Sequence, residues 1–270
     1  MIKCRERRGR PESASLRSDE MYINTKGLVL RETPYKETSR ILTVLTSDLG
    51  KQTVTARGAK RKGSRLAGAC QLLAFSDMTL YGNRGRFVLT EARPIELFEG
   101  LRTDLDRLSL GSYFAEILEA VSNEDIADPE MMSLGLNALY LLSEGKRDEK
   151  LIKCAFELRC MCLAGFEPEL SACSVCGRED VSFPRLELLG GTVRCRDCLD
   201  EKASGKSAAL CTGSLAAMRH IAHSEAKKVF SFSLGEDALE RLSAAAEGFL
   251  ITQLDRGFGT LSFYKSIKEH

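Results

Sequence analysis

Residues 39–57 read SRILTVLTSDLGKQTVTAR, and this stretch decides the fold of the amino-terminal part of the chain. Two runs rich in β-branched residues, 39–47 and 51–57, meet at a tight turn that ends at Gly50, which is typical of a β-hairpin. Runs of the same kind cover 22–30, 72–81 and 86–93, and the sequence GNRG at 82–85 provides a second turn. Five short strands in about seventy residues predict a five-stranded OB-fold β-barrel, with an SH3-like barrel as the structural alternative.

The remainder of the chain has a helical pattern. After Pro94 the spacing of apolar residues changes from two to about 3.6, which indicates α-helices. Asp128 before Pro129 is a favourable helix start, because aspartate caps the first turn and proline fits the first helical position. The predicted helices cover residues 101–121, 129–143, 149–164, 213–223 and 236–254. The predicted fold class is therefore α+β and multidomain, with an α-helical bundle after the barrel.

Two Cys-x-x-Cys pairs interrupt the helical series. They are separated by eighteen residues and consist of Cys173, Cys176, Cys195 and Cys198. This spacing is typical of a tetrahedral Zn²⁺ site, and four thiolates leave no open position for water. We therefore expect one structural Zn²⁺ per chain in a small module that packs on the bundle. A redox pair would need a flanking βαβ pattern and two disulfides an oxidising compartment, so both alternatives are weaker.

Other potential metal ligands have simpler explanations. Cys154, Cys160 and Cys162 lie on a predicted helix, where cysteine behaves as a small buried hydrophobic residue. His220 and His223 lie three residues apart on another predicted helix, but the four thiolates already complete a tetrahedron.

The composition is that of a folded globular protein, with 43% hydrophobic and 29% charged residues. No run of apolar residues is long enough for a membrane span, and the first residues lack the apolar core of a signal peptide. Ten cysteines fit a reducing compartment. A cytoplasmic location is therefore expected.

The net charge of +1 conceals a division between the two halves of the chain. Residues 21–95 contain 13 Lys and Arg against 5 Asp and Glu, a net charge of +8. Residues 96–270 contain 20 against 29, a net charge of −9. Such asymmetry indicates that the basic half binds a polyanion such as nucleic acid.

The basic charge is concentrated in residues 56–69, ARGAKRKGSRLAGA, which contain no acidic residue. Together with Lys51 this loop offers six positive charges for phosphate contacts, whereas the alternative is a solvated surface loop. If all six met single-stranded phosphates, the salt slope would be about −4, or a loss of roughly two hundred-fold in affinity from about 50 to 200 mM salt. The loop is not a P-loop, because Ser64 and Arg65 follow Gly63 where Lys and then Ser or Thr are required.

Residues 1–20 contain few apolar residues and are expected to be disordered. The predicted strand directly after Met21 suggests that they are an extension from an upstream start codon. A basic arm that touches nucleic acid is the alternative.

From residue 21 to about 265 the chain resembles the RecO family of bacterial recombination mediator proteins. The resemblance is carried, in this order, by residues 27–65, by FELRCMCLAGFEPEL at 156–170, by the four cysteines and by LSFYKSI at 261–267. It implies an extension at 1–20, an OB-fold DNA-binding domain at 21–95, a helical domain at 96–170 and 201–270, and a zinc module at 171–200.

The resemblance implies a DNA repair protein that is not an enzyme. Such proteins bind single- and double-stranded DNA, anneal complementary strands and, with RecR, help to load RecA onto strands covered by single-stranded-DNA-binding protein. The predicted DNA-binding residues are Arg40, Lys51, Arg57, Lys60, Arg61, Lys62 and Arg65. The acidic-apolar tail of the single-stranded-DNA-binding protein is expected to dock between the helices, where the available cations are Lys146, Arg147, Lys150 and Lys153. No motif singles these cations out, and a solvated helix face is the favoured interpretation of them.

Two alternatives belong to other functional classes. The first is a zinc-stabilised RNA-binding or regulatory interaction protein, and the second is an enzyme with catalytic zinc, which would need an open coordination position. The chain has no tryptophan, and the predicted barrel offers only Tyr22, Tyr35, Phe75, Tyr81 and Phe87 for stacking. Phosphate contacts are therefore predicted to outweigh base stacking.

Overall fold

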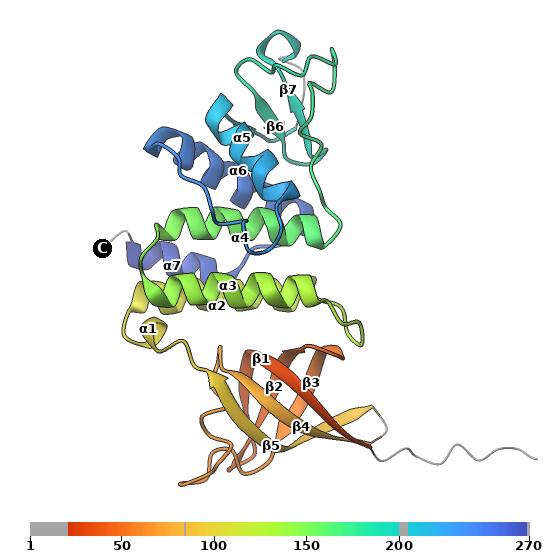
Figure 1. Cartoon of the computed structure of the whole chain (residues 1–270), viewed down its shortest axis with the longest axis vertical. Coiled ribbons are helices and arrows are strands. Elements are labelled where there is room, and N and C mark those ends of the chain that lie inside the picture. The colour runs from red at the N-terminus through yellow and green to blue at the C-terminus, as the bar shows by residue number, and fades with distance from the viewer. Residues whose placement is uncertain (1–20, 84, 200–204, 269–270) are drawn as a thin grey trace, which may run out of the picture.

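The computed structural model describes residues 21–83, 85–199 and 205–268, so the expectation for residues 1–20 lies outside the described residues. The described chain is elongated, with a β-barrel at one end, a layered group of helices in the middle and a small cysteine-bearing sheet at the other end (Figure 1). The α+β fold class predicted from the sequence is confirmed.

The amino-terminal strands form a closed sheet in the order β1-β2-β3-β5-β4. Neighbouring strands are antiparallel except for β3 and β5, whose short parallel pairing joins Val54 to Phe87 and closes the barrel. All five predicted strands are present. Their bounds are β1 Met21–Tyr35, β2 Ser39–Thr46, β3 Gly50–Ala56, β4 Phe75–Asn83 and β5 Arg86–Glu96. Successive side chains of a strand point to opposite faces, so every second residue points into the barrel. These inward residues form a core of aliphatic side chains that includes Val29, Leu42, Val44, Val54 and Leu80.

The β2–β3 turn attaches the barrel to the helical part. Gly50 has a φ of +65°, and a Cβ at this position would lie 2.4 Å from the carbonyl oxygen of Ile126. The backbone N–H of Lys51 donates to the carbonyl of Asn123 at 3.0 Å, and Gln52 Nε2 donates to Asp125 Oδ1 at 2.8 Å. Only glycine permits both this turn and this close approach.

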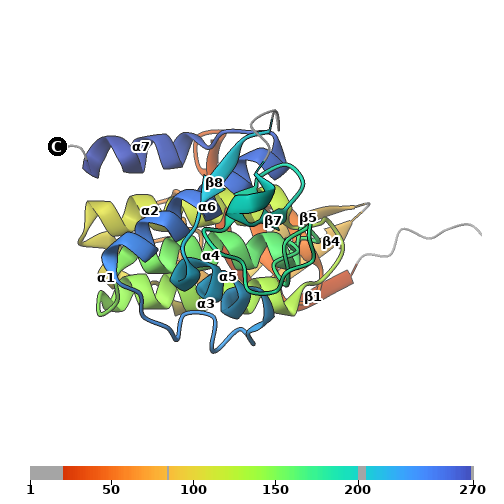
Figure 2. The ribbon, with the colours of Figure 1, turned by 90° about the horizontal axis from the view of Figure 1, so that it is seen from above.

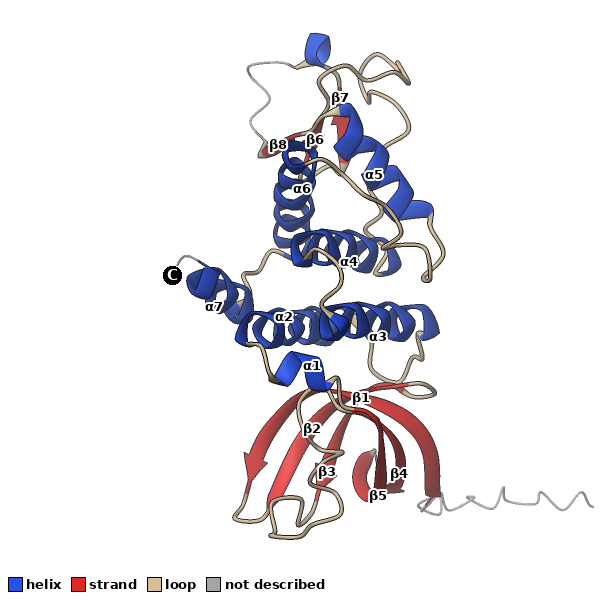
Figure 3. Ribbon diagram, turned by 60° about the vertical axis from the view of Figure 1, so that its left-hand side comes forward, coloured by secondary structure: helices blue, strands red, loops and turns tan. Residues whose placement is uncertain are grey.

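The helical part contains seven α-helices among the described residues. Their bounds are α1 Glu99–Arg102, α2 Leu105–Val121, α3 Pro129–Glu144, α4 Glu149–Leu163, α5 Thr212–His223, α6 Glu236–Leu254 and α7 Gly259–Lys268. Helices α2 and α3 lie next to the barrel, and α4 separates them from α5 and α6 (Figure 3). No helix of the described residues is both long and apolar enough to cross a bilayer.

The prediction of one helix over 101–121 is wrong. The chain forms the short α1, turns at Thr103 and Asp104, and restarts as α2, because the Asp104 side chain accepts the backbone N–H of Arg107 at 3.1 Å and caps the new helix. Leu105 is the first residue of α2 and is 58% exposed.

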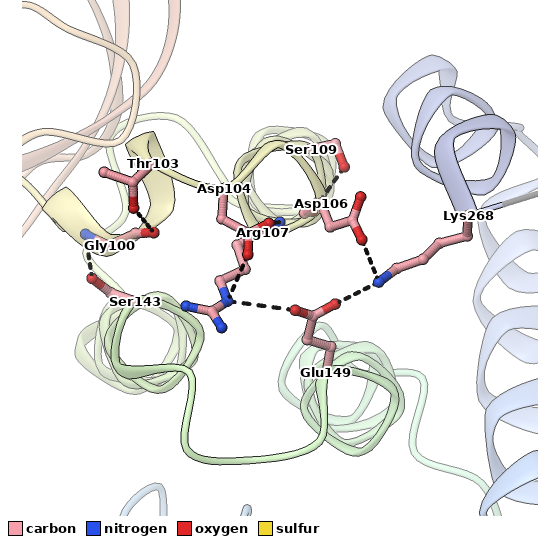
Figure 4. A network of polar contacts seen from close by, with 9 residues as sticks. All are labelled: Gly100, Thr103, Asp104, Asp106, Arg107, Ser109, Ser143, Glu149 and Lys268. Atoms are coloured by element: carbon pink, nitrogen blue, oxygen red, sulfur yellow. Dashed lines mark hydrogen bonds and ion pairs between the residues drawn. The ribbon is translucent and has the colours of Figure 1, made fainter. Parts of the chain in front are cut away.

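The carboxy-terminal helix α7 was not predicted from the pattern. It packs along α2, as Figures 1 and 2 both show. Lys268 Nζ pairs with Asp106 at 2.6 Å and with Glu149 at 3.1 Å, and Arg107 extends this network between α2 and α4 (Figure 4). A helix of ten residues has only marginal stability in isolation, so α7 depends on these tertiary contacts for its stability.

A small sheet follows α4. Its strands β6 Arg185–Glu187, β7 Thr192–Arg194 and β8 Ser207–Ala209 are ordered β7-β6-β8, and none of the three was predicted from the sequence. Leu186 and Val193 are fully buried in the same core as the helices, and Gln253 Nε2 of α6 donates to the carbonyl of Leu188 at 2.7 Å. The cysteine module is thus packed on the bundle, as predicted.

An ion pair is buried at the centre of the helical part. Lys153 and Glu157, on successive turns of α4, are 3% and 0% exposed and lie 2.7 Å apart. Glu157 Oε1 also accepts the Tyr113 hydroxyl of α2 at 2.7 Å, and Lys153 donates to Glu247 of α6 at 2.9 Å. Burial acts to lower the pKa of Lys153, but the two carboxylates outweigh it and raise the pKa. The pair therefore joins α2, α4 and α6.

Gly50→Ala tests the attachment of the barrel. The substitution should lower the free energy of unfolding by about 3 kcal/mol, because the new Cβ strains the turn and meets Ile126. Gly63→Ala is a matched control, since Gly63 also has a positive φ but no atom near the added Cβ, and it should cost only about 1 kcal/mol. Urea unfolding measures both, and equal costs would contradict the docked turn.

Lys153→Met tests the buried pair. It should destabilise the fold by about 3–5 kcal/mol, because the Glu157 carboxylate is left buried without its cation, and Lys153→Met combined with Glu157→Leu should recover most of the loss. Chemical denaturation of both variants provides the measurement. A Lys153→Met protein as stable as the parent would show that Glu157 does not carry a charge that needs compensation.

Candidate metal centre and nucleic-acid interface

The four predicted ligand cysteines lie together. The sulfurs of Cys173, Cys176, Cys195 and Cys198 all lie within 4.8 Å of one another, and they form the only group of this kind found in the described part of the chain. Cys176 and Cys195, from different pairs, have their sulfurs 3.8 Å apart. A tetrahedron with metal–sulfur bonds of about 2.3 Å has edges of about 3.8 Å, so four thiolates in these positions fit one metal ion.

Backbone hydrogen bonds shape the two turns that carry these cysteines. The carbonyl of Cys173 accepts the N–H of Gly177 at 2.9 Å, where Gly177 has a φ of +70°, and the carbonyl of Cys195 accepts the N–H of Cys198 at 3.1 Å. The N–H of Ser174 donates to the carbonyl of β7 residue Val193 at 2.9 Å and brings the two turns together. The cluster is therefore positioned by the sheet.

Electrostatics favour a cation at the cluster. Burial acts to raise the pKa of Cys173, but backbone N–H groups of Cys176, Cys195 and Val175 outweigh it and lower the pKa to about 6. Hydrogen bonds to the sulfurs of Cys195 and Cys176 raise the pKa of Cys198 to about 12. A bound cation would displace the proton of Cys198, because a metal binds the thiolate form of cysteine.

Cysteines and histidines outside the cluster have other partners. Cys154 and Cys160 are fully buried in the helical core, and burial raises the pKa of Cys154 to about 12, as expected for cysteines that fill a core. His220 Nε2 lies 3.0 Å from the carbonyl of Lys228, and His223 lies 3.4 Å from Glu167. These residues do not extend the cluster.

The basic loop between β3 and β4 is a series of tight turns. Lys60 N–H donates to the carbonyl of Thr38, Arg61 N–H to that of Gly58 and Ser64 N–H to that of Arg61, all at about 3 Å. Ala59 and Cys70 anchor the loop in the barrel core, and Ala69 is also fully buried. The exposed cations of the loop form no ion pair with any described residue; they are Arg57, Lys60, Arg61, Lys62 and Arg65. The loop cations are therefore accessible to an external anion.

A groove of about 790 Å³ runs beside this loop, at the end of the barrel that faces away from the helices. It is lined by cations from three segments and by aromatic rings, and no acidic residue contributes. The cations are Lys36, Arg57, Arg61 and Arg86, and the rings are Tyr35, Tyr81 and Phe87. Cations that meet phosphates and rings that stack on bases are the two components of a single-strand binding site.

Two residues that sequence reasoning missed, Lys36 and Arg86, line this groove. Lys36 has a φ of +53°, and its ammonium lies 5.3 Å from the centre of the Tyr35 ring. Arg86 follows the glycine of the β4–β5 turn. Each lies beside a predicted strand, Lys36 between the first two strands and Arg86 at the start of the fifth. Which strand ends meet at one surface follows only from the strand order of the barrel.

Two predicted DNA-binding residues are engaged within the chain. Arg40 is only 25% exposed, pairs with Glu32 and donates to the carbonyl of Cys70 at 3.3 Å. Lys51 lies at the opposite end of β3, where its ammonium donates to the carbonyl of Glu119 in α2 at 2.7 Å. The structure therefore does not bring Lys51 together with the loop.

The four cations considered for a partner tail are engaged within the chain. Lys146 pairs with Glu144, Lys150 with Glu240 and Lys153 with Glu157, and Arg147 donates to the carbonyl of Phe230 at 2.5 Å. Lys150 and Lys153 also line a hollow of about 590 Å³ between α4, α6 and α7, together with Lys265 and Lys268.

Comparisons with known proteins agree with the two-part architecture. A family model described as the recombination protein O N-terminal domain matches residues 21–98, and one described as the recombination protein O C-terminal domain matches residues 102–262. Together they define a recombination protein built from an amino-terminal barrel and a helical part.

Curated relatives carry the same name. A DNA repair protein RecO of Acetivibrio thermocellus is 28% identical over 246 residues, which are 91% of this chain and 97% of the relative. A RecO protein of Desulforamulus reducens is 30% identical over 88% of this chain and 94% of its own length, and one of Desulforudis audaxviator is 38% identical over 65% of this chain and 70% of its own. The chain belongs to the RecO family, which assigns it a role in recombination and DNA repair.

Proposed function

We propose that the chain binds DNA through the groove at the free end of the barrel and anneals complementary strands. The observation that carries this proposal is the composition of the groove, where Lys36, Arg57, Arg61 and Arg86 meet three aromatic rings and no carboxylate. Single-stranded DNA fits this combination best, because its phosphates and its unstacked bases are both accessible. Double-stranded DNA would be held by the exposed loop cations, which contact phosphates without reading sequence.

Annealing needs no catalytic group in this mechanism. Two strands repel each other through their phosphates, and the unpaired cations of the loop and groove lower that repulsion when both strands lie on the same surface. We therefore assign no enzymatic activity to the chain.

The strand order, in which β5 returns parallel beside β3, supports an OB-fold barrel, since a parallel pair requires a crossover rather than a hairpin.

Membership of the RecO family supports a proposal for the partners of the chain. We propose that the chain acts in the cytoplasm, at the nucleoid, where it works with RecR to load RecA onto single strands covered by single-stranded-DNA-binding protein. The hollow between α4, α6 and α7 is the candidate site for the acidic tail of the latter protein; each of its four lysines is paired with a carboxylate of the chain, so the tail would exchange with these internal partners.

We propose that the thiolate cluster holds one structural Zn²⁺. Four sulfur ligands in a closed tetrahedron suit zinc, and its binding energy would stabilise the small sheet. The cluster lies at the end of the molecule opposite the groove, which supports a structural rather than a DNA-contacting role.

Cys195→Ala tests the zinc proposal. The purified parent protein should contain about one Zn²⁺ per chain, whereas the variant should contain almost none and should unfold at a lower temperature. Metal analysis and thermal denaturation provide the two measurements. Cys162→Ala, which removes a half-buried thiol outside the cluster, should keep its zinc; a zinc-free parent protein would contradict the proposal.

Charge reversal tests the DNA surface. The variant Lys60→Glu, Arg61→Glu, Lys62→Glu should bind a single-stranded oligonucleotide at least about tenfold more weakly, and its salt slope should be less steep by about 2, because three phosphate contacts are lost. Fluorescence anisotropy across a salt series measures both, and a strand-annealing assay should show the same loss.

A matched control separates this surface from overall charge. Lys206→Glu, Lys227→Glu, Lys228→Glu produces the same change in net charge on exposed residues of the helical half, and it should leave binding nearly unchanged. Equal losses in both variants would contradict the groove as the binding surface. Tighter binding to duplex RNA than to DNA at matched salt would favour an RNA-binding function instead.

A further inference from the structure

Tyr22, near the start of β1, is the most exposed aromatic residue of the barrel. It is 69% exposed, and its ring contacts that of Tyr81 on β4, with ring centres 5.3 Å apart and an angle of 51° between the ring planes. The two residues are register partners on adjacent antiparallel strands. Because such partners point to the same face of a sheet, they form one aromatic surface on the outside of the barrel.

This aromatic surface continues the lining of the basic groove. Tyr81 is one of the rings that line the groove, together with four cations and no carboxylate, whereas Tyr22 lies just beyond the groove. A DNA strand that leaves the groove past Tyr81 therefore reaches the ring of Tyr22 next.

The other rings of the barrel have less open surface for a base. Phe75 packs against the helical core and Phe87 against the barrel core. Tyr35 is 40% exposed, and the ammonium of Lys36 lies over its ring, 5.3 Å from the ring centre. Tyr22 thus offers the largest accessible aromatic surface beside the groove cations.

The charges on the same face of the sheet limit the path of a strand. Two residues further along β1, Asn24 lies opposite Thr79, whose Oγ1 donates to Asn24 Oδ1 at 2.9 Å. Past this neutral pair the face carries mixed charges, which are Asp48, Asp77, Glu91, Lys26 and Arg93. Their sum is not positive, so this part of the face does not attract a polyanion as the groove does. The attraction for phosphates ends at the tyrosine pair.

We propose that Tyr22 is a base-stacking residue at the edge of the groove and that it favours single-stranded over double-stranded DNA. The bases of a single strand are accessible and can stack on an aromatic ring, whereas the bases of a duplex are already stacked on one another. The phosphates of both forms can meet the cations, so the ring adds a contact that only the single strand makes. This inference rests on the proposed function and names the form of DNA that the groove selects.

Tyr22→Leu, which keeps an apolar side chain on β1 but removes the ring, tests the inference. It should bind a single-stranded thymidine oligonucleotide about five- to one-hundred-fold more weakly than the parent, as expected for the loss of one base–aromatic stack. The salt slope should not change, because no phosphate contact is lost. Tyr22→Phe should bind like the parent, and so should Tyr140→Ala, which removes another exposed ring from α3. Fluorescence anisotropy measures these affinities.

Two further ligands separate stacking from a change in the shape of the barrel. A duplex of the same length and an abasic strand, which has the phosphates without the bases, should each bind Tyr22→Leu as tightly as they bind the parent. A Tyr22→Leu protein that binds all three ligands more weakly by the same factor would show that Tyr22 supports the barrel, and would overturn the inference.

The charge-reversal variant separates failure of this inference from failure of the proposed function. Weaker binding by Lys60→Glu, Arg61→Glu, Lys62→Glu, together with parent-like binding of the thymidine oligonucleotide by Tyr22→Leu, would leave the groove as the binding surface and overturn the stacking role alone. A parent protein that binds no single-stranded oligonucleotide would overturn both.

Discussion

The attachment of the barrel through its β2–β3 turn is the contact on which the arrangement of charge depends. Gly50 lies directly against Ile126, and Lys51 and Gln52 bond to the segment that follows α2. Strand β3 leads away from this turn, and Val54 and Thr55 near its end pair with Phe87 and Val88 at the start of β5, so the loop after β3 and the turn between β4 and β5 lie at the far end. The basic residues are thereby held away from the acidic helices, which would otherwise neutralise them.

Much of the barrel could be predicted because its signals are local. β-Branched runs and turn residues define the five strands, and a core of small aliphatic side chains follows from their alternation. The cysteine cluster was equally accessible, since four ligands at a fixed spacing describe one tetrahedron. The break between α1 and α2 was missed because Asp104 reads as an ordinary polar residue of a long helix, and its capping role depends on backbone geometry.

The groove could be predicted only in part, for a different reason. The loop cations are consecutive in the sequence, but Lys36 and Arg86 reach the same surface through strand pairing, which joins residues far apart along the chain. Lys51 shows the opposite effect: it is close to the loop in sequence, yet a seven-residue strand carries it to the other end of the barrel. Charge counts identify a basic domain but not the face on which the charges gather.

The contact between α7 and α2 has a consequence for biosynthesis. Lys268 and Asp106 are separated by more than half of the chain, and Glu149 joins them from a third helix. The barrel, whose strands are all contained in residues 21–96, can fold while the ribosome is still translating the later helices. The helical half can close only after α7 has left the exit tunnel, so a nascent chain passes through a period in which its barrel is complete and its helical part is not.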